Sequence, residues 1–360
     1  MSGFLYTASR DTTTGEVSFY DKAGNVLCSF SPQSGLVDDP TQPLYLLSKA
    51  DGSTVRLAQQ AADPFEISTD GVTWETATKN SDYTLANGEG LYIRAQSQRT
   101  YFPTSGQKML RILMTGTIEA WNNVNSVLSP DFENISDLST IGAHCLRGLF
   151  SRKLNDSEYD TALVKPPLFP ATTLSESCYQ HCFYGCQSLT HCATVSATTL
   201  AYRACRAMYY ECVALAEAVL PPALTVSSNA YSNMFKGCTG LLSIRSFPFT
   251  SLDLSGVSHC GEMFAGCTSL TSAPLLTPSV LLGESDRYAP SYNNMFNGCT
   301  SLSEVRIAAT DIKDQSAYPG TYMWLSNVAP TGDFYCDPNT PFPTDSVSGI
   351  PTGWQRLPLT

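Results

Sequence analysis

The sequence has no long apolar run, little charge and no basic stretch. No segment approaches the roughly 20 apolar residues that a membrane-spanning helix needs, so we expect no membrane span. Charged residues make up only 15%, and acidic residues outnumber Lys and Arg by 32 to 21, which gives a net charge of -11. An acidic chain without a basic run is a poor ligand for the phosphate backbone, so we expect no nucleic-acid partner. Uncharged polar residues take the place of charge, as is common in β-rich extracellular and virion proteins.

The sequence also lacks the common catalytic motifs. It contains no Gly-rich phosphate loop, no Gly-x-Ser-x-Gly elbow and no His-Glu-x-x-His. Two carboxylate pairs, Asp38-Asp39 and Asp311 with Asp314, lie in a predicted turn and a predicted loop, where solvated charge is the ordinary interpretation. We therefore predict a protein that is not an enzyme, with no catalytic residue, metal or cofactor.

A secretion signal is missing from the start of the sequence. Met-Ser-Gly-Phe-Leu-Tyr-Thr-Ala-Ser-Arg has no basic n-region and no apolar h-region. Two interpretations stay open: a signal was removed upstream of Met1, or the protein does not use the secretory route.

What the sequence does contain is a repeated nine-residue motif. Asn-Met-Phe-Asn-Gly-Cys-Thr-Ser-Leu occupies 294–302. Its copies are Glu-Met-Phe-Ala-Gly-Cys-Thr-Ser-Leu at 262–270, Asn-Met-Phe-Lys-Gly-Cys-Thr-Gly-Leu at 233–241, His-Cys-Phe-Tyr-Gly-Cys-Gln-Ser-Leu at 181–189 and a degenerate Ala-Met-Tyr-Tyr-Glu-Cys-Val-Ala-Leu at 207–215. The motif cysteines are 26, 26, 29 and 32 residues apart, and such a period indicates a solenoid. Leu149-Phe150 matches Met-Phe, so we expect a first, degenerate repeat to begin near Cys145.

Each repeat predicts a helical turn followed by a short strand. Tyr-x-x-Met-Phe, as at 231–235 and 292–296, has the i, i+3, i+4 spacing of a helix face. The following Gly should end that helix in a left-handed conformation, which Glu211 would strain in the degenerate copy. A Leu three residues after each motif cysteine begins a strand whose alternate residues enter the core. The predicted core positions are Leu189, Leu215, Leu241, Leu270 and Leu302, followed by Cys192, Ala218, Ile244, Ala273 and Val305.

Thirteen cysteines allow three interpretations. Because most recur at one repeat position in a long chain, we favour buried free thiols over a disulfide framework. A metal cluster of Cys178, Cys182, Cys186 and Cys192 with His181 and His191 lacks the paired knuckles of zinc sites. A Cys-His nucleophile would need an exposed thiol of low pKa, which a buried repeat cysteine does not provide.

The N-terminal third is predicted to be β-structure. Residues 1–38 form an N-terminal hairpin for attachment, with Val17, Phe19 and Val26, Cys28, Phe30 alternating around a turn at 21–25. Residues 39–117 form a small antiparallel β domain of the sandwich type, with hairpins around Asp51-Gly52 and Asp70-Gly71.

The remainder is predicted to be the solenoid, over 118–325, and a Pro- and aromatic-rich C-terminal cap over 326–360. Tyr322-Met323-Trp324-Leu325 is similar to a last motif without its Gly-Cys. The predicted fold class is α+β: a β-sandwich-like domain followed by a leucine-rich-repeat solenoid with a cap.

The Phe-x-Gly-Cys-x-Ser-Leu core, with the preceding Pro170-Ala171-Thr172-Thr173-Leu174 and Ser196-Ala197-Thr198-Thr199-Leu200, resembles the BspA-like (Treponema-type) leucine-rich repeats of bacterial surface proteins. Ser-Thr-Asp-Gly-Val-Thr-Trp at 68–74 is similar to the β domain that precedes such repeats in gut Bacteroidetes proteins, and 324–354 is similar to their C-terminal end. The resemblance covers roughly 41–360 and implies adhesion or recognition. Related arrangements occur in phages and prophages of these bacteria.

Ligand-binding residues are expected on the strand face of the solenoid, five and seven residues after each motif cysteine. These positions are His191 and Ala193, Glu217 and Val219, Ser243 and Arg245, Ser272 and Pro274, and Glu304 and Arg306. Among them His191, Glu217, Arg245, Glu304 and Arg306 are the candidate binding residues. An ordinary solvated face is the alternative interpretation.

The function that these expectations favour is a non-enzymatic binding or structural protein. We expect a phage virion component, associated with the tail or a fibre, whose N-terminal segment contacts other virion or surface proteins. The repeats would bind a host-surface protein or glycan. The alternative is a bacterial cell-surface, extracellular adhesin whose signal peptide is absent from this sequence. A homo-oligomer is compatible with either, although no heptad run indicates one.

Overall fold

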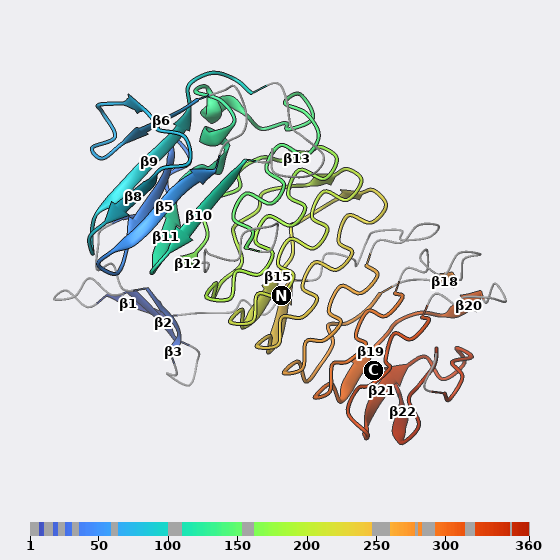
Figure 1. The fold of residues 1–360 in the computed structure, drawn as a ribbon. Helices are drawn as coiled ribbons and strands as arrows, with labels where there is room; N and C mark the ends of the chain where they lie inside the picture. Colours follow the sequence, from blue (N-terminus) through green and yellow to red (C-terminus); the bar gives the residue numbers. More distant parts are fainter. Residues whose placement is uncertain are drawn as a thin grey trace. The chain divides into compact units, whose positions relative to one another are not determined.

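The computed structural model describes residues 7–10, 17–20, 26–30, 36–58, 64–99, 110–152, 162–246, 260–277, 280–282, 292–313, 321–345 and 348–359 (Figure 1). The chain divides into two compact units, Met1–Asp38 and Asp39–Thr360. Within the described residues the regular structure is almost entirely strand. Its two helices are short 3-10 turns, η1 (Val124–Val127) and η2 (Phe132–Asn134). The predicted α+β class is therefore not confirmed. The described part of the chain is mostly strands, with a solenoid in its C-terminal part.

The first unit contains three antiparallel strands in the order β1-β2-β3. They are β1 (Thr7–Arg10), β2 (Val17–Tyr20) and β3 (Val26–Phe30). The predicted hairpin is confirmed, because Val17 lies opposite Phe30 and Phe19 lies opposite Cys28. Strand β1, which pairs with β2, was not predicted.

The second unit begins with two sheets built mainly from antiparallel pairs. The larger has the order β12-β11-β4-β9-β6-β7 and the smaller the order β10-β5-β8. Their strands are β4 (Leu44–Ser48), β5 (Ser53–Ala58), β6 (Phe65–Ser68), β7 (Glu75–Thr76), β8 (Asp82–Leu85), β9 (Gly90–Ala95), β10 (Arg111–Thr115), β11 (Ile118–Trp121) and β12 (Leu163–Lys165). Alternate residues of β5 are buried, as expected for a strand with one face in the core. Strand β12 pairs with β11 in parallel and joins the larger sheet to the first turn of the solenoid.

One of the two hairpins predicted in this region is wrong. Around Asp70-Gly71, strands β6 and β7 pair as predicted, with Ile67 opposite Glu75. At Asp51-Gly52 the chain also turns, and Gly52 has a φ of +73°. However, β4 pairs with β9 and β11 whereas β5 pairs with β8 and β10, so this turn carries the chain from one sheet to the other. A turn signal fixes the local reversal of the chain, but not the sheet that the second strand joins.

The C-terminal part is a β-solenoid of about six turns, as the repeat period predicts (Figure 1). Its short strands pair in parallel with the equivalent strands of neighbouring turns, and Thr173, Thr199 and Thr225 lie in one row. Five strands in two ladders lie in the earlier turns: β13 (Thr173–Leu174), β14 (Thr199–Leu200) and β16 (Thr225–Val226), and β15 (Glu217–Val219) with β17 (Ser243–Ser246). The later turns contain β18 (Val280–Leu282) with β20 (Asp311–Lys313), and β19 (Glu304–Arg306) with β21 (Gly332–Cys336) and β22 (Trp354–Pro358).

The predicted helix in each repeat is replaced by a run of consecutive β-turns, here called the turn segment, that ends at the motif cysteine. In the segment 227–238 the N–H groups of even-numbered residues donate to the carbonyl three residues back, as Met234 does to Tyr231 at 3.1 Å. The N–H groups of Asn233, Phe235 and Gly237 donate instead to carbonyls of the next turn of the solenoid. Every fourth residue has a positive φ, for example Asn233 at 60° and Gly237 at 75°. This left-handed residue interrupts any α-helix and closes a type II turn instead.

The left-handed position before each motif cysteine is confirmed. Gly185, Gly237, Gly266 and Gly298 have φ values between 75° and 80°, and Glu211 takes the same conformation at 58°. A side chain there is strained, as predicted for the degenerate copy, because Cβ approaches the following carbonyl oxygen.

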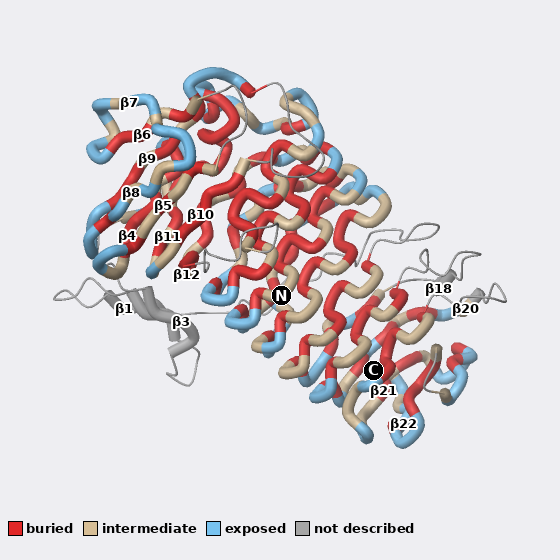
Figure 2. Tube along the Cα trace, in the orientation of Figure 1, coloured by how far each residue is buried: buried red, intermediate tan, exposed pale blue. Residues whose placement is uncertain are grey.

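Buried residues recur at equivalent positions in successive turns of the solenoid (Figure 2). The core is built from in-register rows of like side chains. The second residue of each Met-Phe pair contributes a stacked ring, with centroids 5.2–5.6 Å apart and planes within 7° of parallel. Phe150 is the first ring of this row, so the degenerate first repeat is confirmed. We call this row the aromatic ladder: Phe150, Phe183, Tyr209, Phe235, Phe264 and Phe296. The five predicted core leucines are all fully buried.

The motif cysteines form a second row, the thiol ladder. Each thiol donates to the carbonyl of the aromatic-ladder residue in the preceding turn, at 3.0–3.3 Å. The same carbonyl usually accepts an N–H from its own turn, as Phe235 O does from Cys238. Cysteine suits this position because it is small and apolar and still donates weakly. The described cysteine side chains are all free thiols; all but the partly exposed Cys192 are buried, so the predicted free thiols are confirmed there.

The C-terminal segment closes the end of the core. Trp324 and Leu325 occupy the Met-Phe positions of a last turn, since Phe296 N–H donates to Trp324 O at 2.9 Å. The Trp324 ring is fully buried, stacks on Phe342 at 6.2 Å and donates its Nε1–H to the Gly349 carbonyl at 3.1 Å. Strand β22 then adds to β21 as the last strand of its sheet.

Candidate functional site

The five residues predicted from the strand face lie in separate places. Glu217 and Arg245 of neighbouring turns form an ion pair at 2.6 Å, and the Arg245 side chain is 69% exposed. Glu304 and Arg306 pair within one strand at 3.4 Å. His191 shares a 2.7 Å hydrogen bond with Thr190. Exposed ion pairs of this kind contribute little to stability, and the five side chains do not converge on one cavity.

Most of the strand-face positions lie at the surface, but Ala193 does not. It was expected to point outward, yet it is only 4% exposed. Its N–H donates to the hydroxyl of Tyr209 at 2.9 Å. A large ring with a polar tip in the aromatic ladder therefore pulls this strand position into the core. Tyr209 is the only tyrosine among the six rings of that ladder.

The described residues do not support the metal-cluster or nucleophile interpretation of the cysteines. No group of three or more His, Cys, Asp or Glu side chains there could hold a metal ion. Burial raises the pKa of the Cys182 thiol well above its usual value. A thiol held protonated in this way is a poor nucleophile.

The carboxylate pairs are only partly described. Asp39 accepts from the N–H of Thr41 at 2.8 Å and from its hydroxyl at 2.7 Å, which lowers the pKa of Asp39 and fits the predicted turn. In the second pair Asp311 begins β20, whereas Asp314 lies outside the described residues.

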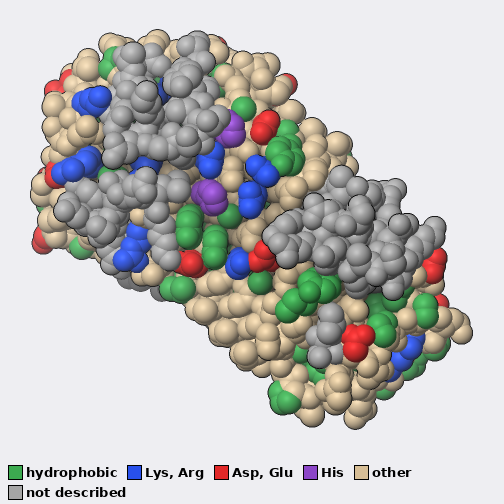
Figure 3. All heavy atoms as spheres, turned by 45° about the vertical axis from the view of Figure 1, so that its right-hand side comes forward, with side chains coloured by type: hydrophobic (Ala, Val, Ile, Leu, Met, Phe, Trp, Pro, Cys, Tyr) green, Lys and Arg blue, Asp and Glu red, His purple; other side chains and the backbone are tan. Residues whose placement is uncertain are grey.

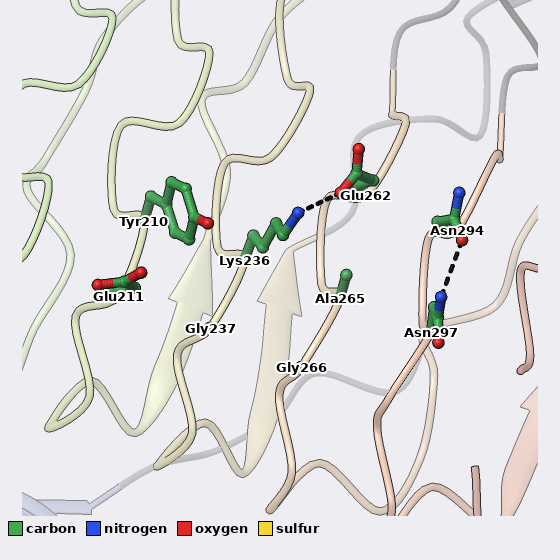
Figure 4. A pocket seen from close by; sticks show the side chains of 9 residues that line it. All are labelled: Tyr210, Glu211, Lys236, Gly237, Glu262, Ala265, Gly266, Asn294 and Asn297. Carbon is green, nitrogen blue, oxygen red and sulfur yellow. Dashed lines mark hydrogen bonds and ion pairs between the residues drawn. The ribbon is translucent and has the colours of Figure 1, made fainter. Parts of the chain in front are cut away.

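A groove of about 330 Å³ crosses the turn segments on the surface of the solenoid. Its walls carry one phenol ring, two carboxylates, one ammonium group and two amides, and glycines form part of its floor (Figure 4). We call it the turn-face groove; it is lined by Tyr210, Glu211, Lys236, Gly237, Glu262, Ala265, Gly266, Asn294 and Asn297.

The glycines before the motif cysteines keep this groove open. A Cβ built on Gly266 would meet nothing closer than the Cα of Gly237, at 3.7 Å, and one built on Gly298 would meet the Cα of Gly266 at 3.6 Å. The glycines therefore stack on one another from turn to turn. The conformation that requires glycine at the turn also leaves a strip of bare backbone at the surface.

Hydrogen bonds and ring contacts hold the lining side chains in order. Lys236 forms an ion pair with Glu262, and its ammonium lies 5.8 Å from the centre of the Tyr210 ring. Asn297 donates to the Asn294 carbonyl oxygen at 2.9 Å. Tyr210 stacks on Tyr184 of the preceding turn with centroids 4.8 Å apart and planes 9° from parallel. The groove thus offers fixed donors, acceptors and one aromatic face.

The sequence contains a signal for this groove that the strand-face prediction missed. In each turn segment two residues point inward and the next two point outward, as Met234 and Phe235 precede Lys236 and Gly237. The outward residues include the first and fourth positions of the nine-residue motif, where the copies differ most. The fourth positions are Tyr184, Tyr210, Lys236, Ala265 and Asn297.

No family model matches the chain, and searches of curated proteins and of solved structures return no significant match. In the described part of the chain, no helix has the length and apolarity required to cross a bilayer.

Proposed function

We propose that this protein is a non-enzymatic recognition protein whose solenoid binds a host-surface glycan through the turn-face groove. One observation carries the proposal: the motif positions that vary from copy to copy come together around a single groove. Binding sites combine a concave surface with a few fixed polar groups. A stacked tyrosine supplies an apolar face for a sugar ring, and the carboxylate, amide and ammonium groups match sugar hydroxyls.

We further propose that the protein is a phage virion component of the tail or fibre, with the BspA-like architecture that the motif resembles. The solenoid would present the groove outward, while residues 1–38 attach the protein to its assembly. A surface rich in uncharged polar residues suits exposure outside a cell. Immunogold electron microscopy on intact particles should label the virion. Labelling confined to the bacterial envelope would instead support the surface-adhesin alternative.

Groove variants test the binding site directly. We expect wild-type protein to bind a subset of glycans on an array, and Tyr210→Ala and Asn297→Ala to weaken binding at least about tenfold, which corresponds to roughly 1.4 kcal/mol. The matched control is Arg245→Ala, which removes an exposed cation from the strand face. If the control abolishes binding and the groove variants do not, the strand face is the site. Equal thermal unfolding of all variants keeps the comparison valid.

A further inference from the structure

A basic cluster interrupts the surface of this acidic chain. It occupies outward positions of the first turn segments, where Figure 3 shows histidine side chains among Lys and Arg. In-register rows bring its members together. His144 lies two turns from Arg203 in one row, since His144 N–H donates to Glu176 O and Ser177 N–H to Tyr202 O. Arg147 lies two turns from Arg206 in the next row, since Gly148 N–H donates to Gln180 O and His181 N–H to Arg206 O. The basic cluster consists of His144, Arg147, His181, Arg203 and Arg206.

The ionisable groups of this cluster lie near enough to affect one another. Burial, and then the charges of Arg206 and Arg203, lower the pKa of Arg147. Burial, and then Arg147 and Arg206, lower the pKa of His181 to about 4. A pKa of about 4 leaves His181 neutral at neutral pH, so the arginines supply the positive charge. Like charges near one another raise the free energy of the folded protein, and an anion bound to Arg203 and Arg206 would offset that cost.

Several buried polar atoms of the cluster make no hydrogen bond within the described residues. Within the described residues, His144 Nδ1, His181 Nδ1 and Arg203 Nε are buried and make no hydrogen bond. Arg203 and Arg206 form no ion pair with any carboxylate in that part of the chain; Arg203 lies over the Tyr202 ring at 4.6 Å. Buried polar atoms are normally satisfied, so this group is unusual. These three atoms are covered by the protein, but Arg203 and Arg206 are only half-buried, so a ligand can reach these two side chains.

The basic cluster continues into the turn-face groove. The His181 ring lies 5.6 Å from the Tyr184 ring, which stacks on Tyr210 at the edge of the groove. Lys236 follows, 5.8 Å from the Tyr210 ring centre. One extended ligand can therefore contact the arginines and the groove together.

We propose that the basic cluster binds the anionic group, a carboxylate or a sulfate ester, of an acidic glycan that runs along the tyrosine pair into the turn-face groove. Guanidinium groups pair with either anion through two parallel N–H donors. A polysaccharide fits better than an acidic peptide because the turn segments use alternate N–H groups within the segment and between turns, which leaves no strand edge for a peptide to join. The inference rests on the proposed glycan-binding function.

The test uses the full chain and isothermal titration calorimetry with four probes: a uronate-containing oligosaccharide, a sulfated one, a neutral one of equal length and a polyglutamate peptide. We expect one acidic oligosaccharide to bind at least tenfold tighter than the neutral one, with the preference shrinking as salt rises. Comparison of the first two probes identifies the anion. Equal binding of acidic and neutral probes, or polyglutamate binding as tight as the best glycan, would overturn the inference.

Variants separate this inference from the proposed function. Arg203→Gln with Arg206→Gln should remove the preference for the acidic probe and leave neutral binding unchanged, whereas Arg245→Gln, the control cation, should leave both unchanged. If the double variant fails to fold by circular dichroism, Arg206→Gln alone decides. A double variant that keeps the acidic preference refutes the cluster. If wild-type protein binds acidic and neutral probes equally, and Tyr210→Ala abolishes binding of the neutral probe, the cluster is refuted while the proposed function stands. No binding of any glycan refutes both.

Discussion

The same substitution, Tyr→Phe, is predicted to have opposite effects at different rungs of the solenoid. At Tyr209 the hydroxyl accepts the buried N–H of Ala193 at 2.9 Å. At Tyr179 and Tyr292 the hydroxyls are buried without a hydrogen-bond partner in the described residues. Removal of one oxygen thus leaves a buried donor unsatisfied in the first case and removes a buried unsatisfied group in the second.

The magnitudes follow from the cost of an unpaired buried polar group. Tyr209→Phe should lower the free energy of unfolding by about 1–3 kcal/mol, because the Ala193 N–H loses its acceptor. Tyr292→Phe should leave it unchanged or raise it by up to about 1 kcal/mol, because the phenol no longer has to be desolvated. Burial raises the pKa of both tyrosines well above 10, so each hydroxyl is neutral at ordinary pH.

Urea unfolding followed by circular dichroism measures the difference. We expect the midpoint to fall for Tyr209→Phe and to hold or rise for Tyr179→Phe and Tyr292→Phe, with the slope unchanged in all three. Hydrogen exchange at the Ala193 amide should accelerate only in Tyr209→Phe. The reasoning is refuted if the three variants shift the midpoint by the same amount in the same direction.

Three further predictions concern the glycine, ring and thiol rows. Gly266→Ala should cost about 1 kcal/mol through its left-handed φ alone, since a Cβ would meet no atom closer than 3.7 Å. Gly266→Asn should cost less, because Asn adopts the left-handed conformation more readily than Ala; equal urea midpoints for Ala and Gly would contradict this. Phe235→Ala should cost about 3–5 kcal/mol in urea unfolding, whereas a loss below 1 kcal/mol would show that the stacked rings relax into the gap. Burial raises the pKa of Cys299 from 9.0 to about 12, so the unfolded chain releases this proton first. Stability should therefore fall as pH rises from about 9 towards 12, and Cys299→Ala should reduce that dependence.

The sequence predicts the repeat but not its local conformation. The spacing of Tyr231, Met234 and Phe235 matches a helix of 3.6 residues per turn, yet the buried positions recur every four residues: Ala230-Tyr231, Met234-Phe235, Cys238. Over a single motif, a period of 3.6 residues cannot be distinguished from a period of four. What decides between them is the left-handed residue at every fourth position, and only Gly among those residues signals it clearly. Asn233 and Glu262 adopt the same conformation, although their residue types do not predict it clearly.

The candidate site was missed because its residues come from separate turns. The first and fourth motif residues point away from the core on a helix as well as in a run of turns, so their variability alone does not say whether they come together. Only the stacking of the turns shows that Lys236, Ala265 and Asn297, from three successive turns, line one groove. The strand-face residues were predicted from the alternation of inward and outward side chains along a strand. Glu217 and Arg306 follow that alternation, but it does not say whether the outward side chains of different turns form one site.

The thiol ladder has a mechanical consequence. The Phe235 carbonyl accepts one bond from its own turn and one from Cys267 of the next, and five junctions between turns carry such a thiol bond in addition to their backbone bonds. A pull along the stacking direction loads these junctions in series, and the weakest should yield first while the others hold. If the protein is attached at one end and binds a surface through its turns, as proposed above, it would lengthen stepwise under tension instead of releasing at once.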